Sequence, residues 1–204
     1  MTRTRLMTML LAPAAIVSLS ACGINSIPTA EEDAKARWAD VENQYQRRAD
    51  LVPNLVESVK GAAAQERNVL REVTEARASA TRIQMSPEQL RDPEAMRAFS
   101  EAQGRLTSAI IPLQRLQEAY PDLKSNQNFL ALQSQLEGTE NRITIARTDY
   151  NGAVQRYNTR IRTFPDVIGA KIFYGAEPMV PFDATSKNAE EAPAIKFDTN
   201  TNAQ

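Results

Sequence analysis

The chain has 204 residues, and its 24 Lys or Arg against 25 Asp or Glu give a formal net charge of −1 at pH 7. This balance does not suggest a nucleic-acid partner, which usually requires a concentrated basic face. The sequence has no His and one Cys, which excludes Ser-His-Asp and Cys-His catalytic sites, imidazole metal sites and an internal disulfide. Few glycines, with Leu, Ala and Val at helical spacing, predict an all-α domain without a cofactor.

Residues 1–21 have the composition of an export signal. Arg3 and Arg5 form a basic start, and an apolar run covers residues 6–17. This run is shorter than the roughly 20 apolar residues of a membrane-spanning helix. The segment ends Leu19-Ser20-Ala21-Cys22, which resembles the lipobox of bacterial lipoproteins.

The lipobox resemblance implies cleavage before Cys22 and acylation of Cys22, so that the chain has a membrane as a partner. Two or three acyl chains make a stable anchor where one does not. Gly23 occupies the position where Asp would resemble a signal for retention in the inner membrane. We therefore expect a cell-envelope lipoprotein, on the periplasmic side of the outer membrane if the organism has two membranes. The alternative is a buried Cys in an ordinary signal segment.

Residues 22–29 are expected to be the lipidated Cys and a tether, and residues 30–164 a helical bundle. Thr29 and Glu32 have the spacing of a capping box at a helix start. A heptad register then runs through Trp38, Tyr45, Val52, Val59, Glu66, Val73 and Ala80, with a second register in which Arg48 is a misfit.

This register crosses Pro53 without slipping, so we favour one helix from Ala30 to Ile83, kinked at Pro53. The alternative is a chain reversal near Pro53 or Gly61, which would make a four-helix bundle. A short helical turn is predicted at residues 86–89, and a further helix from Pro93 to Tyr120.

The next helix, from Asn126 to Thr163, carries the clearest apolar stripe of the chain. One heptad position is large throughout, and the position three residues later is mostly small, which is typical of a long helix buried along one seam. The large residues are Phe129, Leu136, Ile143, Tyr150, Tyr157 and Phe164. The predicted architecture is thus an antiparallel up-and-down bundle of three long helices with short helical pieces.

Residues 165–183 form an apolar tail with several prolines, and residues 184–204 are polar and expected to be disordered. If the first helix is continuous, the chain runs out, back and out again. The apolar tail is then expected at the end of the bundle away from Cys22.

Several spaced blocks resemble the LemA family. They are Arg47 to Glu57 (RRADLVPNLVE), Val73 to Arg77, Tyr120 to Lys124, Leu136 to Ile143, and the pairs Tyr150-Asn151, Tyr157-Asn158 and Phe164-Pro165. The resemblance covers roughly residues 35–182. It implies a helical envelope protein without an established biochemical activity. Family members usually carry a transmembrane helix at the N-terminus, so the lipobox is a departure from the pattern.

The candidate site residues are polar groups on otherwise apolar helices. Arg47, Arg48, Asp50 and Asn54 surround Pro53, and one hypothesis is a partner or small-ligand site at this kink. We favour the alternative that Arg48 or Asn54 satisfies the carbonyl of Ala49, which this proline leaves without a donor. Glu137 and Glu140 are more typical of ion pairs than of acid–base catalysis. Tyr150 and Tyr157 are expected in the seam with bonded hydroxyls. Glu140, Asn151 and Asn158 complete the candidate partner surface.

The sequence therefore predicts a non-enzymatic scaffold or interaction module of the envelope, with unidentified envelope proteins, or copies of itself, as partners. A second hypothesis is a membrane-surface or pore-partner protein that uses the apolar tail. A third is an unrecognised hydrolase.

Overall fold

The computed structural model describes residues 25–61 and 65–182, and these residues are helical or irregular, with no strand among them. This confirms the all-α bundle. Cys22, the signal segment and residues 184–204 lie outside the described residues. The long helices are α2 (Ser26–Lys60), α3 (Arg67–Arg82), α4 (Pro93–Ala119) and α6 (Gln127–Arg160), and the short ones are η1 (Glu88–Arg91), α5 (Pro121–Lys124), α7 (Asp166–Gly169) and η2 (Ala170–Tyr174).

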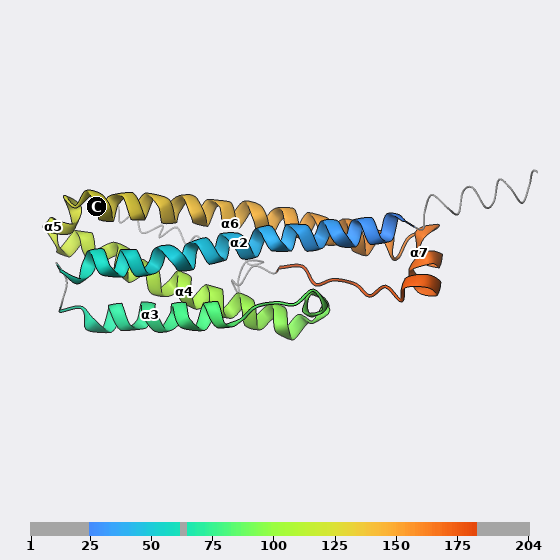
Figure 1. Ribbon diagram of the computed structural model, residues 1–204, viewed down its shortest axis with the longest axis horizontal. Coiled ribbons are helices and arrows are strands. Elements are labelled where there is room, and N and C mark those ends of the chain that lie inside the picture. The colour runs from blue at the N-terminus through green and yellow to red at the C-terminus, as the bar shows by residue number, and fades with distance from the viewer. Residues whose placement is uncertain (1–24, 62–64, 183–204) are drawn as a thin grey trace, which may run out of the picture.

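The first long helix is interrupted, which contradicts the prediction of one helix from Ala30 to Ile83. α2 ends at Lys60, and α3 begins at Arg67 and runs back alongside α2 (Figure 1). The chain therefore reverses near Gly61, as in the alternative arrangement. The heptad register happens to continue across the break. Residue spacing is the same whether a helix continues or the chain turns back, so the register could not predict the reversal. Pro53 lies inside α2 and does not end it.

Helix α2 also starts earlier than its capping pattern predicted. It begins at Ser26, so residues that were expected in the tether are helical. Thr29 lies within the first turns, and its hydroxyl donates to the carbonyl of Asn25 at 2.7 Å instead of capping the helix. Pro28 fits there because the first turn of a helix has no use for its missing N–H.

Helix α6 packs along α2, and α3 packs along α4, while α2 also contacts α3. Helices α4 and α6 make far fewer close backbone contacts with each other. In Figure 1, α4 crosses the bundle obliquely from the end of α3 towards α5. The bundle is therefore incompletely closed between α4 and α6, and this gap is where the unusual features of the structure lie.

The predicted seam of α6 is confirmed in all but its last position. Phe129, Leu136, Ile143, Tyr150 and Tyr157 are all buried. Phe164 is instead 81% exposed, because α6 ends at Arg160 and the helical register ends with it.

The apolar tail lies at the start of α2, and the prediction that it sits at the other end of the bundle is wrong. The Ser26 hydroxyl donates to Asp166 Oδ2 at 2.7 Å, and α7 packs beside the first residues of α2 (Figure 1). The cause is the reversal near Gly61. With four long passes instead of three, the end of α6 returns to the end at which α2 begins.

Helix η2 is followed by Gly175, whose φ of +53° is a left-handed conformation that favours glycine. From there residues 176–182 turn back along the bundle without regular secondary structure (Figure 1). They enter the gap between α6 and the start of α4, where the Val180 amide donates to the Leu90 carbonyl at 2.8 Å.

Candidate functional sites

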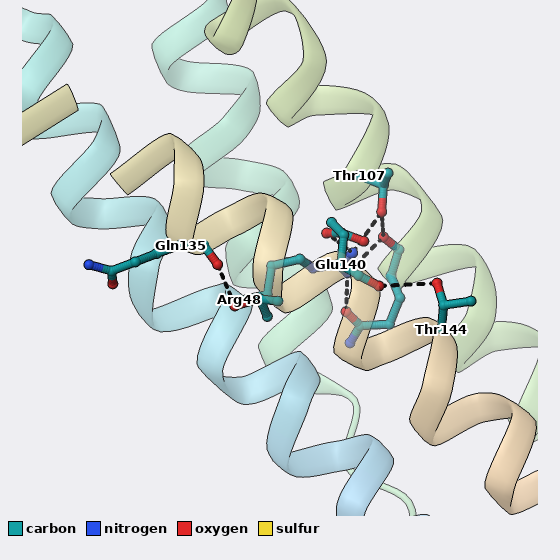
Figure 2. Close-up of polar contacts among 7 residues, drawn as sticks. Arg48, Thr107, Gln135, Glu140 and Thr144 are labelled. Carbon is teal, nitrogen blue, oxygen red and sulfur yellow. Dashed lines mark hydrogen bonds and ion pairs between the residues drawn. The ribbon is translucent and has the colours of Figure 1, made fainter. Parts of the chain in front are cut away.

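Arg48 is the largest fully buried side chain of the bundle, although its charge made it a misfit in the heptad register. Only 1% of its surface is exposed. Its Nη1 donates to Thr107 Oγ1 at 2.7 Å and to Glu140 Oε1 at 3.0 Å, and Figure 2 shows it reaching from α2 to both. Its Nη2 donates to the carbonyl and side-chain oxygens of Gln103, at 3.1 and 2.7 Å.

This network joins all four long helices. Arg48 belongs to α2, Thr107 and Gln103 to α4 and Glu140 to α6, while Gln103 Nε2 donates to the carbonyl of Ala80 on α3 at 3.2 Å. A buried guanidinium must have its donors matched with acceptors, so the network fixes how the helices align. Gln103 and Thr107 were not predicted. Gln103 lies between Phe99 and Leu106 at the spacing of the apolar face of this helix. A polar residue at such a position is the sequence signal that could have identified it.

The carbonyl that Pro53 leaves without its helical donor is satisfied from another helix. Arg77 on α3 donates from Nε to the Ala49 oxygen at 2.7 Å. The expectation that Arg48 or Asn54 does this is wrong, because Arg48 points into the network and Asn54 is exposed. The sequence signal for Arg77 was its place in the family-like block from Val73.

The other candidate residues of α2 lie on its outer surface. Arg47, Asp50 and Asn54 are exposed, at spacings that place them on one face of the helix. Asp50 accepts a hydrogen bond from Gln46 Nε2 at 2.8 Å. The seven candidate residues are thus divided among an exposed face of α2, the buried network and the outer part of α6.

Asn151 and Asn158 of α6 hold the backbone of the extended segment 176–182. Asn158 accepts from the Met179 amide at 2.9 Å and donates to the Met179 carbonyl at 2.8 Å. Asn151 does the same with Phe182, at 2.7 and 3.0 Å. The two tyrosines join them, since Tyr150 donates to the Val180 carbonyl at 2.9 Å and Tyr157 to the Glu177 carbonyl at 3.1 Å. We call these four residues the clamp.

The spacing of the clamp follows from helix and strand geometry. Seven residues of an α-helix rise about 10.5 Å, and three residues of an extended chain span about 10 Å. Asn151 and Asn158 therefore meet Phe182 and Met179 in matching positions, each asparagine pairing with one residue as a neighbouring strand would. The predicted hydrogen bonding of both tyrosine hydroxyls is confirmed.

Burial raises the pKa of Tyr150 well above its ordinary value. It also raises the pKa of Tyr157, an effect that a hydrogen bond with Arg91 partly opposes. Both hydroxyls therefore stay protonated and remain hydrogen-bond donors at neutral pH.

Phe182 completes an aromatic cluster at the entrance to the gap. Its ring stacks with those of Trp38 and Tyr45 at 6.4 and 6.2 Å between centroids, and meets Phe99 edge-on at 6.3 Å. The Arg147 guanidinium lies 4.2 Å from the centre of the Phe182 ring. The tail segment thus supplies core contacts that a closer approach of α4 and α6 would otherwise provide.

Beyond Phe182 the gap forms a groove of about 890 Å³. Arg48 and Tyr45 line it from α2, together with side chains of α3, α4 and α6. Its lining mixes carboxylates with arginines. No group of three or more Asp, Glu, His or Cys able to hold a metal ion occurs within the described residues, and no helix there is long and apolar enough to span a membrane.

These features define an all-α helical bundle whose extended segment 176–182 is held against α6. The LemA family profile matches residues 37–197, most of the chain, and the chain belongs to that family. The match includes Arg48, Arg77 and the clamp, as well as residues beyond Phe182.

The chain is also similar, at low sequence identity, to three curated proteins. The chain is 28% identical over 157 residues to two proteins named magnetosome protein MamQ 1 and MamQ 2 from Paramagnetospirillum magneticum, and 27% identical to magnetosome protein MamQ from Magnetospirillum gryphiswaldense. Each match covers 69% of this chain and 58% of the relative, so the chain spans little more than half of the relatives' length.

Proposed function

We propose that this chain is a bacterial envelope lipoprotein, held to a membrane through acylated Cys22, whose bundle acts as a non-enzymatic scaffold. In a cell with two membranes it would face the periplasm from the outer membrane. The supporting observation is that the polar groups best placed for chemistry hold the fold together. Arg48 and Glu140 join the helices, and Asn151 and Asn158 hold the tail. The magnetosome name belongs to the relatives, and the proposal does not depend on it.

Partners of the scaffold, whether other envelope proteins or further copies of this chain, are proposed to bind the face of α2 that carries Arg47, Asp50 and Asn54. A photo-crosslinking amino acid at Asp50 in intact cells should capture a specific protein. The matched control is the same group at Arg71, an exposed residue of α3. Equal capture at both positions would contradict a partner surface on α2.

The anchor is tested with Cys22→Ser. The variant should accumulate as uncleaved precursor without incorporated palmitate. Processing and palmitate labelling that persist in this variant would exclude the lipoprotein proposal, whatever the outcome of crosslinking.

A second candidate function is favoured by the apolar tip that α7 and η2 form beside the start of α2. Phe164, Ile172 and Phe173 are 81%, 70% and 66% exposed, and Ile168 and Tyr174 are about half exposed. Such a patch of large apolar side chains is unusual on a protein in water. α2 begins at Ser26, four residues after Cys22, so an acyl anchor would hold this tip within about 15 Å of lipid. The exposed Arg162 and Lys171 suit anionic headgroups.

This candidate is a membrane-surface protein whose tip enters the headgroup region. A chain that begins at residue 22, with Ser in place of Cys22, lacks both the signal segment and acyl groups, and it should sediment with vesicles of phosphatidylethanolamine and phosphatidylglycerol. Phe173→Ser should weaken that binding at least about tenfold, since one aromatic side chain contributes roughly 1.5–3 kcal/mol on leaving water. The control is Ile145→Ser, because Ile145 is 53% exposed but lies on α6 away from the tip. Equal binding by both variants would contradict insertion of the tip.

A further inference from the structure

The clamped segment 176–182 closes only part of the gap between α4 and α6. Its chain direction is set by the clamp, since Met179 lies beside Asn158 and Phe182 beside Asn151. The segment therefore runs towards the start of α6. The groove lies further along the same path, where Arg147, Thr144 and Glu140 line it on the α6 side. Among the described residues nothing covers this part of the gap.

The register of the clamp extends into the groove. Three tail residues match seven residues of α6, as the two asparagines show. The same step places Thr185 beside Thr144, which lines the groove. Two further steps place Glu191 beside Leu130, a large apolar side chain of α6 that is 42% exposed.

We infer that residues 183–197 of this chain occupy the groove as an extended segment, antiparallel to α6. The segment is long enough, because its 15 residues span up to about 50 Å and the distance along α6 from Asn151 to Gln127 is about 36 Å. The family profile continues through residue 197, and the apolar Ile195 and Phe197 follow the point at which the register reaches Leu130.

This goes beyond the scaffold proposal, because it defines a binding surface for extended polypeptide and names its occupant. The surface recognises backbone through the outer face of α6 that continues from Asn158 and Asn151 to Leu130. It also departs from the compositional expectation that residues 184–204 are disordered, since a tail with few apolar residues orders when its backbone is held from a folded surface.

The test is a disulfide between the tail and α6 in the full chain. Cys22→Ser removes the only native thiol, and Leu130→Cys with Glu191→Cys then places one thiol on each side of a predicted contact far from the clamp. The control pair is Asn128→Cys with Glu191→Cys, because Asn128 is exposed on the opposite side of the same helix. Mild oxidation should form the intramolecular disulfide at least about tenfold faster in the first pair, and circular dichroism checks that both variants fold.

Equal rates for the two pairs would overturn the proposal, because a free tail samples both faces of α6. A covalent dimer as the main product of the first pair would also overturn it, and would show that the occupant is the tail of a second copy. Hydrogen–deuterium exchange of the unsubstituted chain gives an independent measure. Amides of residues 184–197 should exchange at least about tenfold more slowly than those of residues 199–204, and equal exchange rates would contradict docking.

Discussion

Arg77 on α3 donates a hydrogen bond at 2.7 Å to the carbonyl of Ala49 on α2, the group that Pro53 deprives of its helical partner. One proline thus creates an acceptor inside α2, and the returning helix supplies the donor. The pair ties α3 to the middle of α2, so the residue that interrupts the hydrogen bonding of one helix helps to position the next.

The first prediction separates this bond from ordinary packing. Arg77→Met keeps most of the aliphatic stem and leaves the Ala49 carbonyl unpaired, which should lower the free energy of unfolding by about 1–3 kcal/mol. Pro53→Ala restores an amide that can donate to Ala49, so the cost of Arg77→Met should fall in that background. Urea unfolding of the four variants gives the coupling energy. A cost that is the same in both backgrounds would rule out this pairing, and Arg71→Met serves as the exposed control.

The second prediction concerns the two ends of the buried network. Arg48→Met should destabilise the bundle by about 3–5 kcal/mol, because Gln103 and Thr107 lose their partner inside the core. Glu140→Gln should cost less than about 1 kcal/mol, since that side chain is partly solvated and an amide oxygen still accepts from Arg48. Chemical denaturation measures both, and comparable losses would mean that the ion pair with Glu140 dominates the network.

The third prediction tests which face of α6 is buried. Ile143→Ala removes a side chain of the seam and should cost about 2–5 kcal/mol of unfolding free energy. Ile145→Ala, two residues away on the exposed face, should change stability by less than about 0.5 kcal/mol. Thermal and urea unfolding of the two variants provide the comparison. A larger loss of stability in Ile145→Ala than in Ile143→Ala would show that the wrong face of α6 has been assigned to the core.

The fourth prediction is a dependence on alkaline pH. Burial raises the pKa of Tyr150 in the folded chain, so the folded state holds this proton more tightly than the unfolded state does. The stability that this provides is complete below the ordinary tyrosine pKa of about 10 and decreases as the pH rises above it.

Tyr150→Phe should therefore flatten the loss of stability between about pH 10 and pH 11.5. It should also cost about 0.5–1.5 kcal/mol at pH 7, through the lost bond to the Val180 carbonyl. Unfolding free energies measured across this range give both quantities. Tyr174→Phe, at a half-exposed tyrosine of the tip, is the control, and identical pH profiles for wild type and Tyr150→Phe would contradict the assignment.

The seam of α6 was predictable because each of its large residues repeats every seven positions and faces the same neighbour. The reversal near Gly61 was not, because α2 and α3 happen to share a register, and residue spacing is the same whether a helix continues or turns back. Two charged residues occupy positions of these heptad registers that are otherwise mostly apolar, and one of them, Glu66, lies in the break. Arg48, the other, is the buried charge at the centre of the network. Each misfit residue indicated that simple apolar packing fails at its position. The sequence did not show whether the cause was a break in the helix or a buried charge.

The candidate sites show the same limit. Asn151 and Asn158 were selected because a polar residue beside a seam is free to bind something, and they do bind a backbone. That backbone is the segment 176–182 of the same chain. The sequence could not identify it, because the tail reaches Asn151 and Asn158 only if the chain reverses near Gly61. Arg77 acquired its role from Pro53, 24 positions earlier in the sequence, and only the packing of α3 against α2 brings the two together.

The clamp recognises main-chain atoms, so it constrains the length of the tail more than its side chains. Most substitutions between Met179 and Phe182 leave both asparagine pairings in place. A single inserted residue there would displace the chain by about 3.3 Å and turn every following side chain to the other side. The clamp therefore disfavours insertions and deletions in this segment, even those that leave its buried side chains unchanged in type.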